Sequence, residues 1–521
     1  PYDWRKDIAL TALLLDQKIE SIKQQTGSTK VDVVAHSMGG LVARNYIADA
    51  GKAKNVNRLF VLGTPHLGTV DAIKLLLYGS CFTKPGVPTQ PLCIGITKSE
   101  VRDVIQNMLG VSQLIPSQRY FDFYSGENNL YPFPFRDDRD MDNNSVVGPL
   151  NYFQIKPLLS NLGQNTNLFA PSEVFHSLDD NLANTNGVEV TNIVGSGMPT
   201  LGQIIEKYSI DFLGVKVPHR DELFINGDQT VPLFSASLID SVRNKSLLGD
   251  AKVFYTKQEH GSLISGPAMN LVKNILSGNN QLPDGISVQA YPFGGTVVSV
   301  HSPVSMHAYD SFGNHTGPTS DGNFEANIPG STYDTLDDAK FIWLPKDGQY
   351  SVRLEATDQG SFDFKIRKFE NDINTSTALF DDIPLTVSTK AQTILDTAST
   401  QPPTLQIDQD GNGTTDKSIE PTSLLIGDAN YDETPPQTVI ELSGVQGQNN
   451  WYRSDVTVAL NAQDEANGSG INKTEYSLDD GQTVQTYTGP FAVSQEGVAK
   501  IKYRSSDRAG NAEIPQVAEV K

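Results

Sequence analysis

The amino-terminal part of the chain alternates between helical and strand-like hydrophobic patterns. Apolar residues recur at helical spacing over residues 8–22, which predicts a helix that ends before Gly27. Two buried-strand patterns follow at residues 31–35 and 58–62, with helix-forming sequence between them. This strand–helix–strand order predicts neighbouring parallel strands in one sheet.

The periodic pattern breaks between about residues 75 and 220. The aromatic runs at residues 120–124 and 131–135 are too apolar for ordinary loops. Two interpretations are open: additional core, or a cap inserted between sheet strands that encloses an apolar pocket. We favour the cap, because a strand pattern resumes at residues 221–228 and a helical pattern at residues 267–276 closes the unit.

After residue 283 the hydrophobic pattern has a period of two. Runs at residues 297–301, 305–309 and 350–355 are separated by clusters of Gly, Asn, Asp and Pro, which is typical of antiparallel sandwiches. We therefore predict an α/β domain over residues 1–283 with a cap at about 75–220. A β-sandwich over 284–425, a linker over 426–438 and a second sandwich over 439–521 follow.

The charge balance narrows the class of partner. With 61 acidic against 40 basic residues, the formal net charge is −21, and no basic stripe carries interleaved aromatics, so we expect no nucleic-acid partner. No apolar run approaches the length of a membrane span. The acidic, Asn-, Thr- and Gly-rich composition with two cysteines favours a bacterial extracellular or cell-surface location. The chain begins at Pro1, and we expect that an export signal lay upstream.

The octapeptide at residues 33–40 carries the strongest chemical signal. It leads an apolar strand through Ala35-His36-Ser37-Met38-Gly39 into helix-forming sequence, which is the pattern of a nucleophile elbow. So tight a turn needs small residues two before and two after the serine, and Ala35 and Gly39 meet this need. Met38 opens the helix, where main-chain N–H groups lack helical partners, so we expect its amide in an oxyanion hole.

A serine nucleophile needs a histidine base and a carboxylate that orients the histidine. In the α/β-hydrolase arrangement these follow in the order Ser, Asp, His, beyond the carboxyl ends of strands. Asp228 ends an apolar strand and is the candidate acid, with Asp221 and Asp240 as weaker candidates. His260 follows a later strand and precedes the last helix, so it is the candidate base. A turn aspartate and a structural histidine are the alternative interpretations.

Five motifs in order resemble the lecithin:cholesterol acyltransferase family and its bacterial lipase relatives. They are Pro1-Tyr2-Asp3-Trp4-Arg5, Ala35-His36-Ser37-Met38-Gly39, Gly63-Thr64-Pro65-His66-Leu67-Gly68, Gly227-Asp228-Gln229-Thr230-Val231-Pro232 and His260. The resemblance covers about residues 1–283 and implies an α/β-hydrolase with an inserted cap and an acyl-ester substrate. It also implies that Ser37 is the nucleophile, Asp228 the acid, His260 the base and the Met38 amide an oxyanion donor, with no cofactor for catalysis.

The same resemblance implies a difference at the start of the chain. In that family the first sheet strands, and the loop with a second oxyanion amide, precede the Pro1–Arg5 motif. We therefore expect the first strands of the fold to be missing from this fragment. Loss of one oxyanion donor typically costs a factor of about 10²–10³ in rate.

Two features lie outside this chemistry. Cys81 and Cys93 flank a proline-containing loop in the predicted cap, and a disulfide or two free thiols are both open. The stretch at residues 408–416 resembles a bacterial calcium loop. Its proposed ligands are Asp408, Asp410, Asn412 and Asp416. A hairpin turn built from the same residues is the alternative interpretation.

Residues 434–521 resemble the bacterial Ig-like repeat family, on the motifs at residues 476–479 and 503–511. Such modules imply spacing, or contact with a cell surface or glycan. The whole sequence predicts a secreted serine carboxylester hydrolase acting on lipid or other acyl esters, with a lipid acyltransferase as the alternative. A hypothesis of another class is a non-catalytic surface adhesin with a hydrolase-like scaffold.

Overall fold

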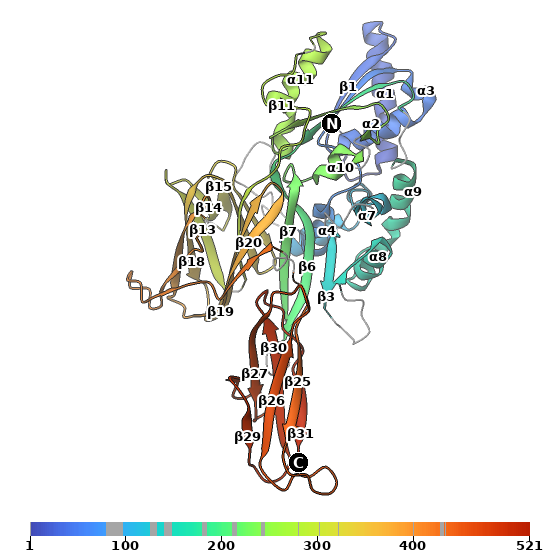
Figure 1. Cartoon of the computed structure of the whole chain (residues 1–521). Helices are drawn as coiled ribbons and strands as arrows, with labels where there is room; N and C mark the ends of the chain where they lie inside the picture. Colours follow the sequence, from blue (N-terminus) through green and yellow to red (C-terminus); the bar gives the residue numbers. More distant parts are fainter. Residues whose placement is uncertain are drawn as a thin grey trace. The chain divides into compact units, whose positions relative to one another are not determined.

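A computed structural model describes residues 2–79, 97–125, 133–139, 148–179, 185–210, 216–240, 245–279, 281–301, 303–320, 322–399, 401–427, 432 and 434–521 (Figure 1). The chain divides into two compact units. Pro1–Glu206, Arg220–Gly294 and Thr319–Glu325 form the first unit, and Lys207–His219, Gly295–Pro318 and Ala326–Lys521 form the second. Cys81 and Cys93, for which a disulfide and two free thiols are both open, lie outside the described residues.

The first unit is built on a five-stranded sheet in the order β1–β2–β5–β10–β11. The first four strands are parallel, and β11 is antiparallel to β10. Their bounds are β1 (Val31–His36), β2 (Val56–Leu62), β5 (Glu189–Gly195), β10 (Lys252–Thr256) and β11 (Ile286–Ser287). The predicted α/β class of this part of the chain is confirmed.

Helices bury apolar residues on both faces of this sheet. Ile8 and Ile19 of α1 (Ile8–Thr26) and Leu41 of α2 (Met38–Ala48) share a core with β1 and β2. Leu271 of α11 (Gly266–Leu276) packs in a second core with residues of β2 and β5. A parallel sheet covered in this way is held together mainly by apolar burial.

Two insertions interrupt the sheet. The first, between β2 and β5, carries α4 (Val70–Tyr78), α5 (Lys98–Ile105), α6 (Leu109–Ser112), α7 (Gln118–Ser125), β3 (Phe135–Asp138), β4 (Gly148–Pro149), α8 (Tyr152–Asn161) and α9 (Phe169–Asp179). The second, between β5 and β10, carries β6 (Met198–Ile210), β7 (Lys216–Gly227), α10 (Leu233–Ser237), β8 (Ile239–Asp240) and β9 (Lys245–Ser246). Strands of both insertions join in one sheet with the order β4–β3–β6–β7, in which β3 and β4 are antiparallel.

The predicted cap therefore needs a correction. A single insertion over residues 75–220 would leave no sheet strand within it, but β5 lies in the middle of the parallel sheet, between β2 and β10. Val190, Ile193 and Val194 are buried there. This strand is short and lies among many other apolar segments, so its pattern alone did not distinguish it from the insertions.

The strands after residue 294 form two antiparallel sandwiches. In the first, a sheet ordered β16–β17–β12–β19–β20–β24 faces one ordered β15–β14–β13–β18–β21–β22–β23. Val298, Val352 and Phe364 belong to the core between them. The strands are β12 (Gly295–His301), β13 (Val304–Asp310), β14 (His315–Pro318), β15 (Phe324–Ala326), β16 (Thr332–Leu336), β17 (Ala339–Pro345), β18 (Gln349–Ala356), β19 (Gly360–Glu370), β20 (Ile373–Leu385), β21 (Lys390–Asp396), β22 (Leu405–Asp408), β23 (Lys417–Ile419) and β24 (Ser423–Ile426).

The last sandwich has sheets ordered β25–β26–β29 and β28–β27–β30–β31. Val458, Ile501 and Tyr503 belong to its core. Its strands are β25 (Gln437–Ser443), β26 (Val456–Gln463), β27 (Ile471–Ser477), β28 (Gln485–Thr486), β29 (Phe491–Val493), β30 (Ala499–Asp507) and β31 (Gln516–Val520). The antiparallel sheets predicted after the α/β part are confirmed.

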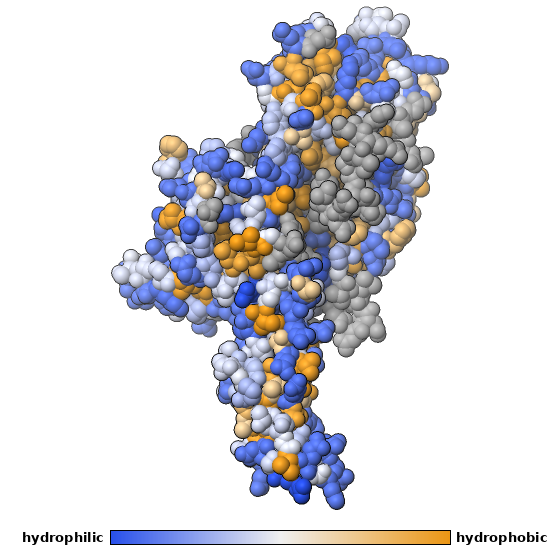
Figure 2. All heavy atoms as spheres, in the orientation of Figure 1, coloured by the Kyte–Doolittle hydropathy of each residue, from blue (hydrophilic) through white to orange (hydrophobic). Residues whose placement is uncertain are grey.

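Hydrophilic residues cover much of the face drawn in Figure 2, and apolar residues gather in separate groups. Among the exposed apolar side chains are Leu10, Leu13 and Leu14 of α1. Across the described parts of the chain, every helix is either too short or too polar to cross a membrane.

Candidate active site

Ser37 lies in the turn between β1 and α2. Its φ of 55° and ψ of −134° place a non-glycine residue in a sparsely populated conformation. The Ser37 N–H donates to the Leu62 carbonyl across the sheet at 2.9 Å, and its carbonyl accepts from the Gly40 N–H at 2.9 Å. These bonds hold the strained turn and present the Ser37 hydroxyl beyond the carboxyl end of β1.

The steric reason for the small residues after Ser37 lies one position later than predicted. A Cβ on Gly39 would be 3.8 Å from the Tyr2 hydroxyl, an ordinary contact. A Cβ on Gly40 would be 1.9 Å from Thr64 Oγ1, which is a clash. Gly40 is therefore the residue that lets α2 approach the loop after β2 closely.

The structure brings the three predicted side chains together. Ser37 Oγ lies 2.8 Å from His260 Nε2, and His260 Nδ1 lies 2.8 Å from Asp228 Oδ2. Since an ionised carboxylate can only accept, His260 Nδ1 carries a hydrogen and Nε2 is free to accept from the Ser37 hydroxyl. His260 begins the 3-10 helix η2 (His260–Ile264), directly after β10.

Asp228 reaches this position by an unexpected route. It follows β7, a strand of the sheet that the insertions form, and yet it lies at the carboxyl end of β5. A Cβ on Gly195, the last residue of β5, would be 2.5 Å from Asp228 Cβ. The β6–β7 hairpin thus leaves the sheet after β5 and returns the carboxylate to the same edge.

Asp228 is fully buried, and the carboxylate oxygen that does not contact His260 also accepts hydrogen bonds. Asp228 Oδ1 accepts from the N–H groups of Val231 at 2.7 Å and Thr230 at 3.1 Å. The weaker candidate Asp221 lies inside β7, where its Oδ1 accepts from the Glu222 N–H. The side chain of Asp240 lies outside the described residues. Among the three candidates, Asp228 is the partner of His260.

The electrostatic environment of His260 favours its charged form. Burial alone would lower the pKa of His260, but the charge and hydrogen bond of Asp228 and the charge of Asp71 together raise it above its usual value. Asp71 lies in the first turn of α4. Sequence reasoning missed Asp71, since only the fold brings α4 near the histidine.

Met38 is the first residue of α2, where N–H groups lack partners within the helix. Its amide therefore lies directly after the predicted nucleophile Ser37, at the position that an oxyanion donor takes in a nucleophile elbow. Its role at the oxyanion stays a prediction.

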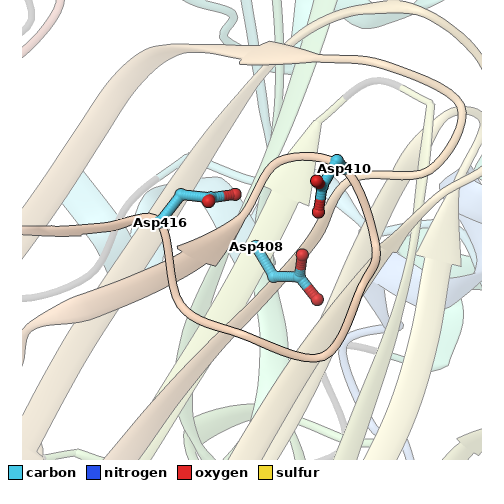
Figure 3. A group of neighbouring side chains, drawn as sticks. All are labelled: Asp408, Asp410 and Asp416. Atoms are coloured by element: carbon cyan, nitrogen blue, oxygen red, sulfur yellow. The ribbon is translucent and has the colours of Figure 1, made fainter.

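The predicted calcium ligands lie in the loop between β22 and β23. The carboxylates of Asp408, Asp410 and Asp416 come within 4.8 Å of one another, and Figure 3 shows them gathered along this loop. Main-chain N–H groups already donate to them: Gly411 and Gly413 to Asp408 at 2.8 Å each, and Gln409 to Asp416 at 2.7 Å. The Asn412 amide N–H₂ donates to Asp410 at 2.9 Å. Oxygen ligands of this kind fit Ca²⁺, and the same bonds also describe a closed hairpin turn.

Residues 1–99 match the lecithin:cholesterol acyltransferase family. The resemblance inferred from the sequence is confirmed over this stretch, which contains Ser37 but ends before Asp228 and His260. The match supports an enzyme that acts on lipid esters, as a hydrolase or an acyltransferase. No curated protein matches the chain.

Three solved structures are similar to the chain at low identity. The Tle4–Tli4 complex is 16% identical over 54% of this chain and 68% of that chain, with a TM-score of 0.35. The Bacillus licheniformis lipase BlEst2 in its propeptide form is 12% identical over 99% and 84%, with a TM-score of 0.29. The phospholipase PlaB from Legionella pneumophila is 12% identical over 71% and 78%, with a TM-score of 0.17.

Proposed function

We propose that this protein is a secreted serine hydrolase that cleaves carboxylic esters of lipids through an acyl-enzyme. The observation that carries the proposal is the unbroken hydrogen-bond chain from Ser37 through His260 to the buried Asp228, with both distances at 2.8 Å. The match of residues 1–99 to the lecithin:cholesterol acyltransferase family supports the lipid-ester substrate class.

In the first half of the reaction, Ser37 Oγ attacks the ester carbonyl carbon while His260 Nε2 takes the hydroxyl proton. The negative charge of the carbonyl oxygen would be held by the Met38 amide. Asp228 stabilises the imidazolium and keeps its Nδ1 hydrogen in place. His260 then donates its proton to the departing alcohol, which leaves Ser37 acylated.

In the second half, His260 removes a proton from the incoming nucleophile, which attacks the acyl carbon; the bond from that carbon to Ser37 Oγ then breaks, and His260 returns the proton to Ser37. Water gives a free acid, whereas a lipid alcohol gives a new ester. The lecithin:cholesterol acyltransferase match keeps this second outcome as a candidate function. Product analysis with and without a sterol or glycerol acceptor separates the two. No cofactor is needed for either reaction in this proposal.

The test is labelling with a fluorophosphonate, which reacts preferentially with an activated serine, followed by peptide mapping to locate the label. We expect the label on Ser37, and expect Ser37→Ala and His260→Ala to remove it. The exposed Ser28→Ala serves as the matched control and should label like the wild type. Absence of label on the folded wild type would favour the non-catalytic adhesin. If the protein is an adhesin, its Ser37→Ala variant should still attach to cells or glycans.

A further inference from the structure

His36, the last residue of β1, contacts the loop that carries the candidate base. Its Nε2 lies 2.8 Å from the main-chain carbonyl oxygen of His260. A carbonyl oxygen can only accept, so His36 Nε2 carries the hydrogen and donates it. The two imidazole rings lie 4.7 Å apart between centroids and are tilted by 44°.

With this hydrogen bond, both the main chain and the side chain of His260 are held by neighbouring residues. The His260 main-chain N–H donates to the Asp228 carbonyl at 2.8 Å, and its carbonyl accepts from His36. Its side chain is held by Asp228 on one nitrogen and by Ser37 on the other. Without His36, the carbonyl side of the residue would lose its anchor to the sheet.

The residue that contacts the His260 carbonyl is the direct neighbour of Ser37 in the chain. His36 and Ser37 are consecutive, so the end of one strand sets both the nucleophile and the main chain of the base. The end of β1 therefore contributes to both sides of the contact between Ser37 Oγ and His260 Nε2, while Asp228 holds the His260 side chain from another element. A displacement of about 1 Å at such a contact can cost about 10²-fold in rate.

We propose that His36 is a positioning residue, which holds the His260 loop through its main-chain carbonyl so that His260 Nε2 stays within hydrogen-bond distance of Ser37. The inference rests on the proposed serine hydrolase function. His36 acts through the His260 loop and not on the substrate.

The charge state of His36 suits this role. Burial lowers its pKa, and the positive charge of His260 lowers it further, while its bond to the His260 carbonyl and the charge of Asp228 act in the opposite direction. The net pKa lies below the usual histidine value. His36 thus stays neutral while His260 takes up the proton of Ser37, and no second positive charge opposes that step.

Three substitutions of His36 distinguish the contribution of its hydrogen-bond donor from that of its ring packing. In His36→Gln an amide N–H₂ reaches about as far as Nε2, so we expect kcat within about 3-fold of the wild type. In His36→Phe the ring remains but the donor is lost, and in His36→Asn the donor is too short. For both we expect kcat to fall 10- to 100-fold with KM changed less than 2-fold. The control His307→Phe, in the second unit, should keep wild-type kcat.

A spectroscopic measurement tests the same inference without turnover. The hydrogen that His260 Nδ1 shares with Asp228 should give a far-downfield proton NMR resonance. We expect this resonance to persist in His36→Gln and to broaden or vanish in His36→Asn and His36→Phe, each checked by its melting temperature. If His36→Phe does not fold, the Gln and Asn pair gives the same comparison.

Two outcomes would overturn the inference. Wild-type kcat and an intact resonance in folded His36→Phe or His36→Asn would show that the bond is dispensable. Equal loss in folded Gln and Asn variants would assign the effect to ring packing. Failure of the proposed function is a separate result: the wild type would then take no label at Ser37, while the resonance comparison would still report on the His36 contact.

Discussion

At the scale of single residues, the chemistry depends on which nitrogen of His260 carries hydrogen. Asp228 accepts from Nδ1 and so leaves Nε2 as the proton acceptor in the proposed mechanism. In Asp228→Asn the amide can donate to Nδ1, which favours the opposite tautomer and removes the base. We expect kcat to fall by about 10⁴-fold with the fold retained, measured with a soluble p-nitrophenyl ester.

The exposed Asp250→Asn is the matched control for this loss and should keep wild-type kcat. If Asp228→Asn kept more than a tenth of the activity, another carboxylate would have to orient His260, and the assignment of the acid would be wrong.

The pH dependence follows from the raised pKa of His260. Only neutral His260 can act as the base, so kcat/KM should fall as pH decreases through a pKa above the ordinary value of about 6.5. Asp71→Asn removes a negative charge that favours the imidazolium, and this should move the acid limb to lower pH. A pH–rate profile of both proteins measures the shift, and an unchanged limb would mean that the charge of Asp71 does not reach His260.

At the scale of elements, the inserted β6–β7 hairpin must return Asp228 against the end of β5. In Gly195→Ala the new Cβ would lie 2.5 Å from Asp228 Cβ and 2.7 Å from the Gln258 carbonyl oxygen. We expect a loss of about 1–3 kcal/mol in the free energy of unfolding, together with a reduced kcat/KM, since the carboxylate is displaced. Chemical denaturation and ester turnover measure the two effects.

Gly261→Ala is the control for stability, because a Cβ there meets no atom within 4 Å. It should leave the melting temperature unchanged. Normal activity and stability in Gly195→Ala would show that the hairpin can shift away from β5 without cost.

The loop between β22 and β23 gives a second prediction at this scale. If Asp408, Asp410 and Asp416 hold Ca²⁺, added calcium should raise the melting temperature. At a free calcium concentration of 100 times the Kd, the free energy of unfolding should increase by about 2.7 kcal/mol. Asp410→Asn should abolish this response, whereas Asp480→Asn in the last sandwich should not. Calorimetry with calcium chloride and with a chelator measures it, and an unchanged transition would assign the loop as a hairpin turn.

At the scale of the whole molecule, the chain divides into two compact units with separate buried cores. We therefore expect unfolding in at least two steps. Leu354→Ala, in the core of the second unit, should cost about 2–5 kcal/mol there and leave the other step in place. Gly195→Ala should shift only the step of the first unit. One transition that moves with either substitution would show that the units unfold together.

Much of this architecture could be predicted from the sequence, because it depends on local patterns. Strand–helix–strand periodicity predicted the parallel strands β1 and β2, and a period of two predicted the antiparallel sheets after residue 283. The short pattern around Ser37 predicted its turn, since few sequences fit so tight a reversal. Asp228 and His260 could be chosen because chain order and position after a strand leave few candidates.

The tertiary structure decided what depends on contacts distant in sequence. It placed β5 inside the region predicted as a cap, because one short buried strand among many other apolar segments is not distinguished by its hydrophobic pattern alone. It showed that Gly40 and not Gly39 is the crowded position, since the neighbour is Thr64 of another loop. It brought Asp228 back to β5 through a strand of a different sheet, and it placed Asp71 and His36 near His260. The sequence by itself determined the types of reactive residue and their order, whereas only packing set the distances between them, because those distances depend on how separate elements meet.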